Sequence, residues 1–86
     1  MKISRLYAKK TDFAAKQPLV ELVGYKRILI ENHMGIVTYS PEEIQIKVSY
    51  GRLSVIGSEL CLMNISREQL AIVGYIESLQ IFRRQV

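Results

Sequence analysis

Few residues in this chain have the types and spacing that catalysis requires. His33 carries an imidazole suited to proton transfer near neutral pH, and Glu31 lies two residues before it, on the same face if a strand extends that far. Cys61 is the single thiol, and its neighbours supply no electropositive setting that would favour the thiolate. Glu42 and Glu43 are adjacent, and adjacent carboxylates seldom converge on one substrate as an acid–base pair. We therefore predict no catalytic residue and no enzymatic activity.

Binding sites for metals, nucleotides and stacked rings are also missing from the sequence. With one cysteine and one histidine, the chain lacks the ligand set of a structural zinc site and cannot form an internal disulfide. Its 5 glycines are isolated, so no glycine-rich phosphate loop is present. The absence of tryptophan and an aromatic content of 8% argue against a platform that stacks bases or sugars. We predict that the protein binds no metal, no cofactor and no small-molecule substrate. We also predict that it resides in a reducing compartment.

Basic charge is concentrated at the start of the chain. Residues 1–27 hold seven lysines and arginines against two acidic residues, whereas residues 28–86 hold five against six. The basic segment could contact an anionic membrane surface or nucleic acid, or it could be a solvated leader, since charge asymmetry alone carries no specificity. Interleaved positions further along are mixed in sign, which disfavours nucleic-acid binding. The candidate anionic-surface contacts are Lys2, Arg5, Lys9, Lys10 and Lys16.

The elements that must position these residues are indicated by apolar alternation. From Pro18 onward, apolar residues recur at every second position in short segments. These positions are Val20 and Leu22, Ile28 and Ile30, Ile44, Ile46 and Val48, Leu53 and Val55, Leu60 and Leu62, Leu70 and Ile72, and Leu79 and Ile81. The intervening residues are mostly polar, which favours antiparallel over parallel sheet. We predict an all-β fold, a small antiparallel meander or rolled sheet of short strands, with a short β-solenoid-like roll as the alternative.

The pattern changes at Pro18, which divides the chain. Residues 1–17 are predicted to be a basic N-terminal arm, and residues 2–16 within it could form a short helix. Residues 18–86 are predicted to be a single β domain, because a chain of this length has room for one thin core. Apolar runs such as residues 20–23 fall far short of the roughly 20 residues that span a bilayer, and no signal-peptide core follows Lys2 and Arg5. We expect neither a membrane span nor secretion by that route.

Glycine and serine positions predict the turns. Tyr50-Gly51 and Gly57-Ser58 each separate two apolar alternations and are predicted to be tight hairpins. Residues 40–43 (Ser-Pro-Glu-Glu) and 66–69 (Ser-Arg-Glu-Gln) match a helix capping box, but period-two residues follow at once. At each place we expect a single helical turn that leads into a strand. A small sheet of this kind leaves apolar surface and unpaired edges, so we predict self-association into a homo-oligomer.

One combination of motifs resembles a known family. Ile30-Glu31-Asn32-His33-Met34-Gly35-Ile36 is followed by Tyr39-Ser40-Pro41-Glu42-Glu43-Ile44. Further along come Gly51-x-Leu53-x-Val55-x-Gly57-x-x-Leu60-x-Leu62, Glu68-x-Leu70-x-Ile72-x-Gly74-x-Ile76 and Leu79-x-Ile81-Phe82. Over residues 18–82, this order and spacing resembles the YqfC branch of the YabP/YqfC family of bacterial sporulation proteins. The N-terminal arm departs from that pattern.

The resemblance implies a sporulation-stage protein of an endospore-forming bacterium. It implies a structural or adaptor module without enzymatic activity, cytoplasmic in the mother cell and peripheral to the forespore membrane. It also implies work alongside a membrane protein, for which a YqfD-type partner is the candidate. Anionic-surface or nucleic-acid binding through the basic arm is the alternative function. The candidate interaction residues are Glu31, Asn32, His33, Gly35, Ile36, Leu79 and Ile81.

Overall fold

Six strands form, and five of them contain the predicted apolar alternations, whereas the strand at residues 36–39 does not. The structure is a computed structural model that describes residues 17–84. Its strands are β1 (Leu19–Val23), β2 (Arg27–Glu31), β3 (Ile36–Tyr39), β4 (Glu43–Val48), β5 (Gly51–Met63) and β6 (Gln69–Arg83). No helix occurs among these residues, so the predicted all-β class is confirmed. The helix predicted at residues 2–16 and the basic contacts Lys2, Arg5, Lys9, Lys10 and Lys16 lie outside the described residues.

The six strands form one antiparallel sheet in the order β1-β2-β6-β5-β4-β3. Strands β3 to β6 follow one another as a meander, and the β1–β2 hairpin joins the far side of β6. The predicted antiparallel sheet is therefore confirmed, and the solenoid-like roll is not what the described chain forms. The β2–β6 pair is long-range, with Ile28 opposite Ile72.

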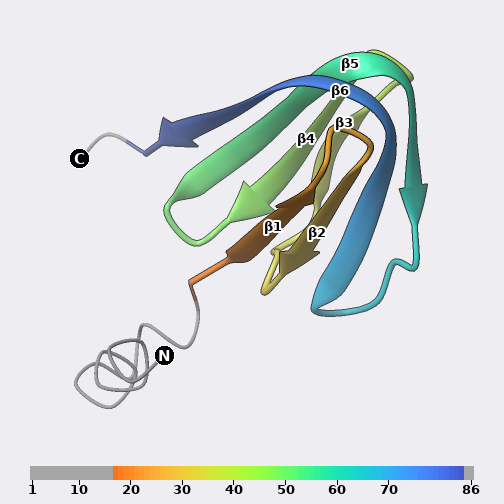
Figure 1. Cartoon of the computed structure of the whole chain (residues 1–86). Coiled ribbons are helices and arrows are strands. Elements are labelled where there is room, and N and C mark those ends of the chain that lie inside the picture. Colours follow the sequence, from red (N-terminus) through yellow and green to blue (C-terminus); the bar gives the residue numbers. More distant parts are fainter. Residues whose placement is uncertain (1–16, 85–86) are drawn as a thin grey trace, which may run out of the picture.

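Strands β5 and β6 are long enough to cross from one side of the fold to the other. They have 13 and 15 residues, and register shifts interrupt their pairing near Gly57 and Ser58. The long hairpin bends there, so that the sheet folds over on itself (Figure 1). We call the two halves the β2 layer (β1, β2, residues 61–63 of β5 and 69–73 of β6) and the β4 layer (β3, β4, residues 51–56 of β5 and 78–83 of β6).

The bend replaces the hairpin predicted at Gly57-Ser58, and that prediction was wrong. A side chain at Gly57 would overlap the carbonyl oxygen of Tyr75, and a Cβ at Gly74 would lie 2.6 Å from the carbonyl oxygen of Glu59. Glycine therefore lets the two backbones approach where β5 and β6 change layer. A bulge and a turn use the same residue types, and here the continued pairing of β5 with β6 decides for the bulge.

Both predicted serine motifs close hairpins instead of starting a helical turn. The Ser40 N–H donates to the carbonyl of Glu43 (2.9 Å), and the Ser40 hydroxyl accepts from the Glu43 N–H (3.0 Å). Ser66 and Gln69 repeat this arrangement at 2.7 and 3.1 Å. The serine oxygens cap the N–H groups that the capping box predicts, but the expected helical turn is wrong because strand pairing begins immediately. The predicted Tyr50-Gly51 hairpin joins β4 to β5 and is confirmed.

The core lies between the two layers. Ile28, Ile30, Leu70 and Ile72 come from the β2 layer, Ile44, Ile46, Val48, Leu53 and Val55 come from the β4 layer, and Leu60 lies at the bend between them. All ten belong to the predicted alternations, and each is at most 4% exposed. Because a strand presents alternate residues to opposite faces, the fold-over buries the apolar face of one layer against that of the other.

Candidate interaction surface

Residues Asn32 to Gly35 connect the two layers. Asn32 adopts a left-handed backbone (φ 65°), which asparagine tolerates well, and its N–H donates to the Glu68 carbonyl at 2.6 Å. Two residues further on, the Met34 N–H donates to the Lys47 carbonyl (2.7 Å), and the Lys47 N–H donates to the Gly35 carbonyl (2.8 Å). The segment is thus bonded at one end to Glu68, the last residue before β6, and at the other end to β4.

His33 holds this connection to the β5–β6 turn. Its Nδ1 lies 3.1 Å from the Gly35 N–H, so Nδ1 is the acceptor, and its Nε2 lies 2.9 Å from the Ser66 carbonyl oxygen, so Nε2 is the donor. These two contacts assign the neutral tautomer with the proton on Nε2. Both ring nitrogens are therefore engaged in holding the backbone, which gives His33 a structural role.

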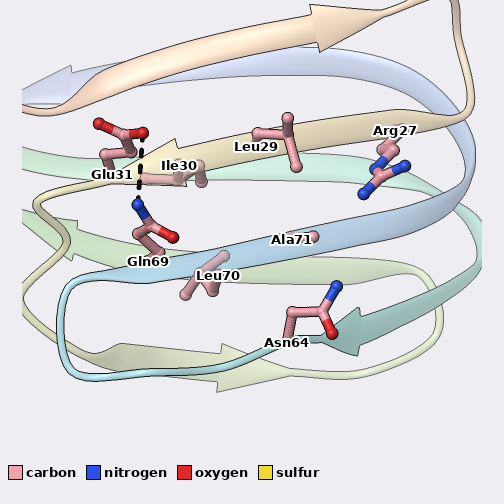
Figure 2. A pocket seen from close by; sticks show the side chains of 8 residues that line it. All are labelled: Arg27, Leu29, Ile30, Glu31, Asn64, Gln69, Leu70 and Ala71. Carbon is pink, nitrogen blue, oxygen red and sulfur yellow. Dashed lines mark hydrogen bonds between the residues drawn. The ribbon is translucent and has the colours of Figure 1, made fainter.

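Glu31 lies at one end of a hollow on the outer surface of β2 and β6. Figure 2 shows Gln69 directed toward Glu31, and its amide donates to the carboxylate at 3.4 Å. Leu29 and the buried Ala71 lie in the middle, and Arg27 lies at the other end. The hollow measures about 220 Å³, below the range of roughly 300–1,000 Å³ typical of small-molecule sites.

The predicted apolar contacts Ile36, Leu79 and Ile81 do not form one patch. Register places Ile36, Ile46, Leu53 and Ile81 in one row across β3, β4, β5 and β6. Ile36 (41% exposed) and Ile81 (60% exposed) therefore lie at opposite margins of the β4 layer, about 14 Å apart at the usual strand spacing. Leu79 is half-buried and packs against the core, so a change there tests folding as much as binding.

The margins of the sheet carry most of the exposed apolar side chains. All four residues of β3 are exposed, among them Val37 and Tyr39, and β3 pairs only with β4. Strand β1 at the other end of the sheet exposes Leu19 and Leu22. Unpaired edges with apolar side chains are sites at which a sheet accepts another strand.

Two groups of side chains were missed by the sequence reasoning. Lys26 Nζ lies 5.6 Å from the ring centroids of both Tyr25 and Tyr75, a cation–π arrangement at the bend. The side-chain amide of Gln45 and the buried hydroxyl of Ser54 each donate to the Glu43 carboxylate at 2.8 Å, and these two bonds, that from Gln45 first, lower the pKa of Glu43. The Tyr-Lys dipeptide in a turn is a signal for the first group, whereas Ser54 looks like any residue of the polar face.

Three further observations concern metal binding, the single cysteine and membrane-spanning helices. Among residues 17–84, no cluster of three or more His, Cys, Asp or Glu side chains could hold a metal ion. Cys61 is a free, exposed thiol on the face opposite the buried Leu60, as the alternation predicts. Within the same range there is no helix with the length and apolarity that a membrane crossing demands.

Comparison with known proteins identifies the family. The model of the YabP family matches residues 14–85, which include every strand of the sheet. The chain belongs to the YabP family. A curated relative, the "uncharacterized protein YqfC" of Bacillus subtilis (strain 168), is 28% identical over 66 residues, which cover 77% of this chain and 71% of the relative. The resemblance read from the motifs is thus confirmed, and membership implies an association with sporulation. No solved structure matches this chain.

Proposed function

We propose that this YabP-family chain is a non-enzymatic structural or adaptor module that acts at the forespore envelope during sporulation. It works in the mother-cell cytoplasm, peripheral to the forespore membrane, and contacts its partners through the unpaired margins of its sheet. A YqfD-type membrane protein is the candidate partner. The observation that carries the proposal is β3, a terminal strand of the sheet on which all four residues are exposed.

The physical reason is the cost of leaving such an edge in water. A terminal strand presents unpaired N–H and C=O groups, and Ile36, Val37 and Tyr39 add apolar surface beside them. A strand from another chain would satisfy the backbone groups and cover these side chains, which is the usual mode of β-augmentation. The hollow at Leu29 and Ala71 (about 220 Å³) is smaller than the usual small-molecule site, and a second hollow of about 440 Å³ beside Lys26, Glu59 and Tyr75 is wide open to solvent, so neither favours a small-molecule function instead.

The experiment uses two substitutions of the same chemistry at equal exposure. Val37 on the β3 edge is 53% exposed, and Ile65, in the connection between β5 and β6, is 54% exposed. In an endospore-forming bacterium that lacks this protein, Val37→Lys should fail to restore heat-resistant spores and forespore-envelope localisation of a fluorescent fusion, whereas Ile65→Lys should restore both. Thermal unfolding of the purified variants checks that both are folded. Equal restoration by both variants would refute the edge as the docking surface.

Binding of an anionic surface through the basic arm is the second candidate, favoured by the seven-to-two charge imbalance of residues 1–27. Each lysine or arginine near an anionic membrane contributes about 1 kcal/mol, and this attraction is screened by salt. Full-length protein should then bind phosphatidylglycerol vesicles with a steep salt dependence, and a chain without residues 1–17 should not. Equal binding by both chains would count against this candidate and leave the edge proposal standing.

A further inference from the structure

The C-terminal half of β6 has one unpaired side. Strand β2 pairs with β6 only over residues 69–73, and the β1–β2 turn extends this by bonds from the Gly74 N–H to the Lys26 carbonyl (3.1 Å) and from the Ile76 N–H to the Tyr25 carbonyl (2.8 Å). From Ser78 to Arg83, β6 pairs with β5 alone, and Glu77 lies at the register shift just before this stretch. Figure 1 shows this stretch at the margin of the fold, with β5 on one side and no strand on the other.

The register decides which backbone groups this edge offers. The Arg84 N–H donates to the Tyr50 carbonyl at 2.7 Å, so residue 84 faces β5. Backbone groups of an antiparallel strand alternate between its two neighbours, and residues 82, 80 and 78 therefore face β5 as well. The N–H and C=O groups of Leu79, Ile81 and Arg83 point to the open side.

This edge is complementary to itself when two copies run antiparallel about Gln80. Leu79 then lies opposite Ile81 of the second copy, in a pair whose backbone groups face each other, and Glu77 lies opposite Arg83. Moving the centre to Leu79 places Glu77 opposite Ile81, and moving it to Ile81 places Arg83 opposite Leu79. Both shifts lose the charge pair, so opposite charges select the register centred on Gln80.

The other terminal edges fit a second copy less well. Pairing β1 with itself about its centre places Glu21 opposite Glu21, which juxtaposes like charges. Strand β3 has four residues, none of them charged, and a register shift between Ile36 and Thr38. On β6, by contrast, Ile81 is the most exposed of the large apolar side chains in the described chain, and pairing would bring it beside the half-buried Leu79 of the second copy.

We propose that two copies of this chain pair antiparallel through residues 77–83 of β6, centred on Gln80, into a two-fold symmetric dimer with one continuous β4 layer. The inference rests on the proposed function in treating sheet margins as the interaction surfaces, and it assigns the β6 margin to self-association. The β3 margin is left for the other partner. A two-fold axis at Gln80 brings both Glu77–Arg83 pairs and both Leu79–Ile81 pairs into the same interface.

The test is a charge swap on the full chain followed by sedimentation velocity over a range of concentrations. Glu77→Arg and Arg83→Glu each place like charges opposite one another at two positions, and each should weaken the dimer by about tenfold or more. The double variant restores opposite charges and should return close to the wild-type dissociation constant. Arg67→Glu, the same charge change in the exposed β5–β6 turn, is the control and should leave the dimer unchanged.

A cross-link gives a second readout that does not depend on charge. Gln80 residues meet across the axis as a non-hydrogen-bonded pair with Cα atoms about 4.5 Å apart, within the range that disulfides need. In a Cys61→Ser background, Gln80→Cys should form a covalent dimer on mild oxidation, and Ser78→Cys should not. Three results would overturn the pairing: a wild-type chain that stays monomeric, a double charge-swap variant that does not recover the wild-type dissociation constant, or equal cross-linking of Gln80→Cys and Ser78→Cys. The adaptor proposal would survive that result, since Val37→Lys and Ile65→Lys test it separately.

Discussion

Replacing Gly74 with alanine should destabilise the bend at which β5 and β6 change layer. Gly74 has φ +142°, and an added Cβ would lie 2.6 Å from the Glu59 carbonyl oxygen and 2.9 Å from the Leu60 Cα. Both atoms belong to the backbone of β5, so no side-chain movement can relieve the clash. Gly24 in the β1–β2 turn is the matched control, since it also has positive φ (+60°) but no atom within 4 Å of its Cβ position.

The magnitudes follow from these two environments. A positive φ costs an alanine about 1 kcal/mol, and this is the whole expected effect at Gly24. At Gly74 the overlap with backbone atoms adds about 2 kcal/mol, as overpacking of a closely packed site usually does. We expect losses in the free energy of unfolding of about 1 kcal/mol for Gly24→Ala and about 3 kcal/mol for Gly74→Ala. Stabilities of domains this size are roughly 4–13 kcal/mol, so both variants should still fold.

Urea unfolding followed by circular dichroism measures the difference. With an m-value of about 1 kcal/mol/M, the midpoint should fall by about 1 M for Gly24→Ala and about 3 M for Gly74→Ala. All samples are compared at one protein concentration, because self-association would add stability that depends on concentration. A loss at Gly74 no greater than that at Gly24 would refute the idea that close backbone approach at the bend requires glycine there.

Three further predictions concern the polar contacts and the core. His33→Ala removes both bonds of the layer connection and should lower the free energy of unfolding by about 1–2 kcal/mol, measured by urea unfolding. Ser54→Ala removes a donor to Glu43, so the pKa of Glu43, measured by carboxyl NMR titration, should rise toward its usual value. Because the pKa of Glu43 is lowered in the folded state, its ionised carboxylate stabilises the fold at neutral pH, and this stabilisation is lost as the pH falls through the lowered pKa. Ser54→Ala should therefore make the free energy of unfolding less sensitive to acid. Ile46→Ala should cost about 2–5 kcal/mol, whereas Ile65→Ala should cost little because that side chain is exposed.

Each of these has an outcome that contradicts it. An unchanged midpoint for His33→Ala would mean that the two ring contacts contribute nothing to joining the layers. A Glu43 pKa that stays the same without the Ser54 hydroxyl would reject the hydrogen bond as a cause of its lowering. Similar losses at Ile46 and Ile65 would be inconsistent with a core enclosed between the β2 and β4 layers.

Apolar alternation from Pro18 onward was sufficient to predict five of the six strands and the buried face, whereas β3 lacks the alternation and was not predicted. Period-two patterning is a local property, because the pleat of an extended chain sends neighbouring side chains to opposite faces whatever the strand pairs with. Ile28, Ile44 and Leu53 could therefore be assigned to the core before any pairing was known. The motif around Glu31-Asn32-His33, combined with the glycine-closed strands that follow it, was likewise sufficient to indicate the family that the comparison confirms.

Tertiary structure alone decided where the sheet bends and which predicted contacts are available. Gly57 looks like a turn residue in sequence, and only the Tyr75 backbone, 18 residues further along the chain, makes it part of a bend. Leu79 and Ile81 share one alternation, yet Leu79 packs on the core while Ile81 stays exposed. The reason is that pairing, bending and cover depend on contacts between distant segments, which a pattern of neighbouring residues does not contain.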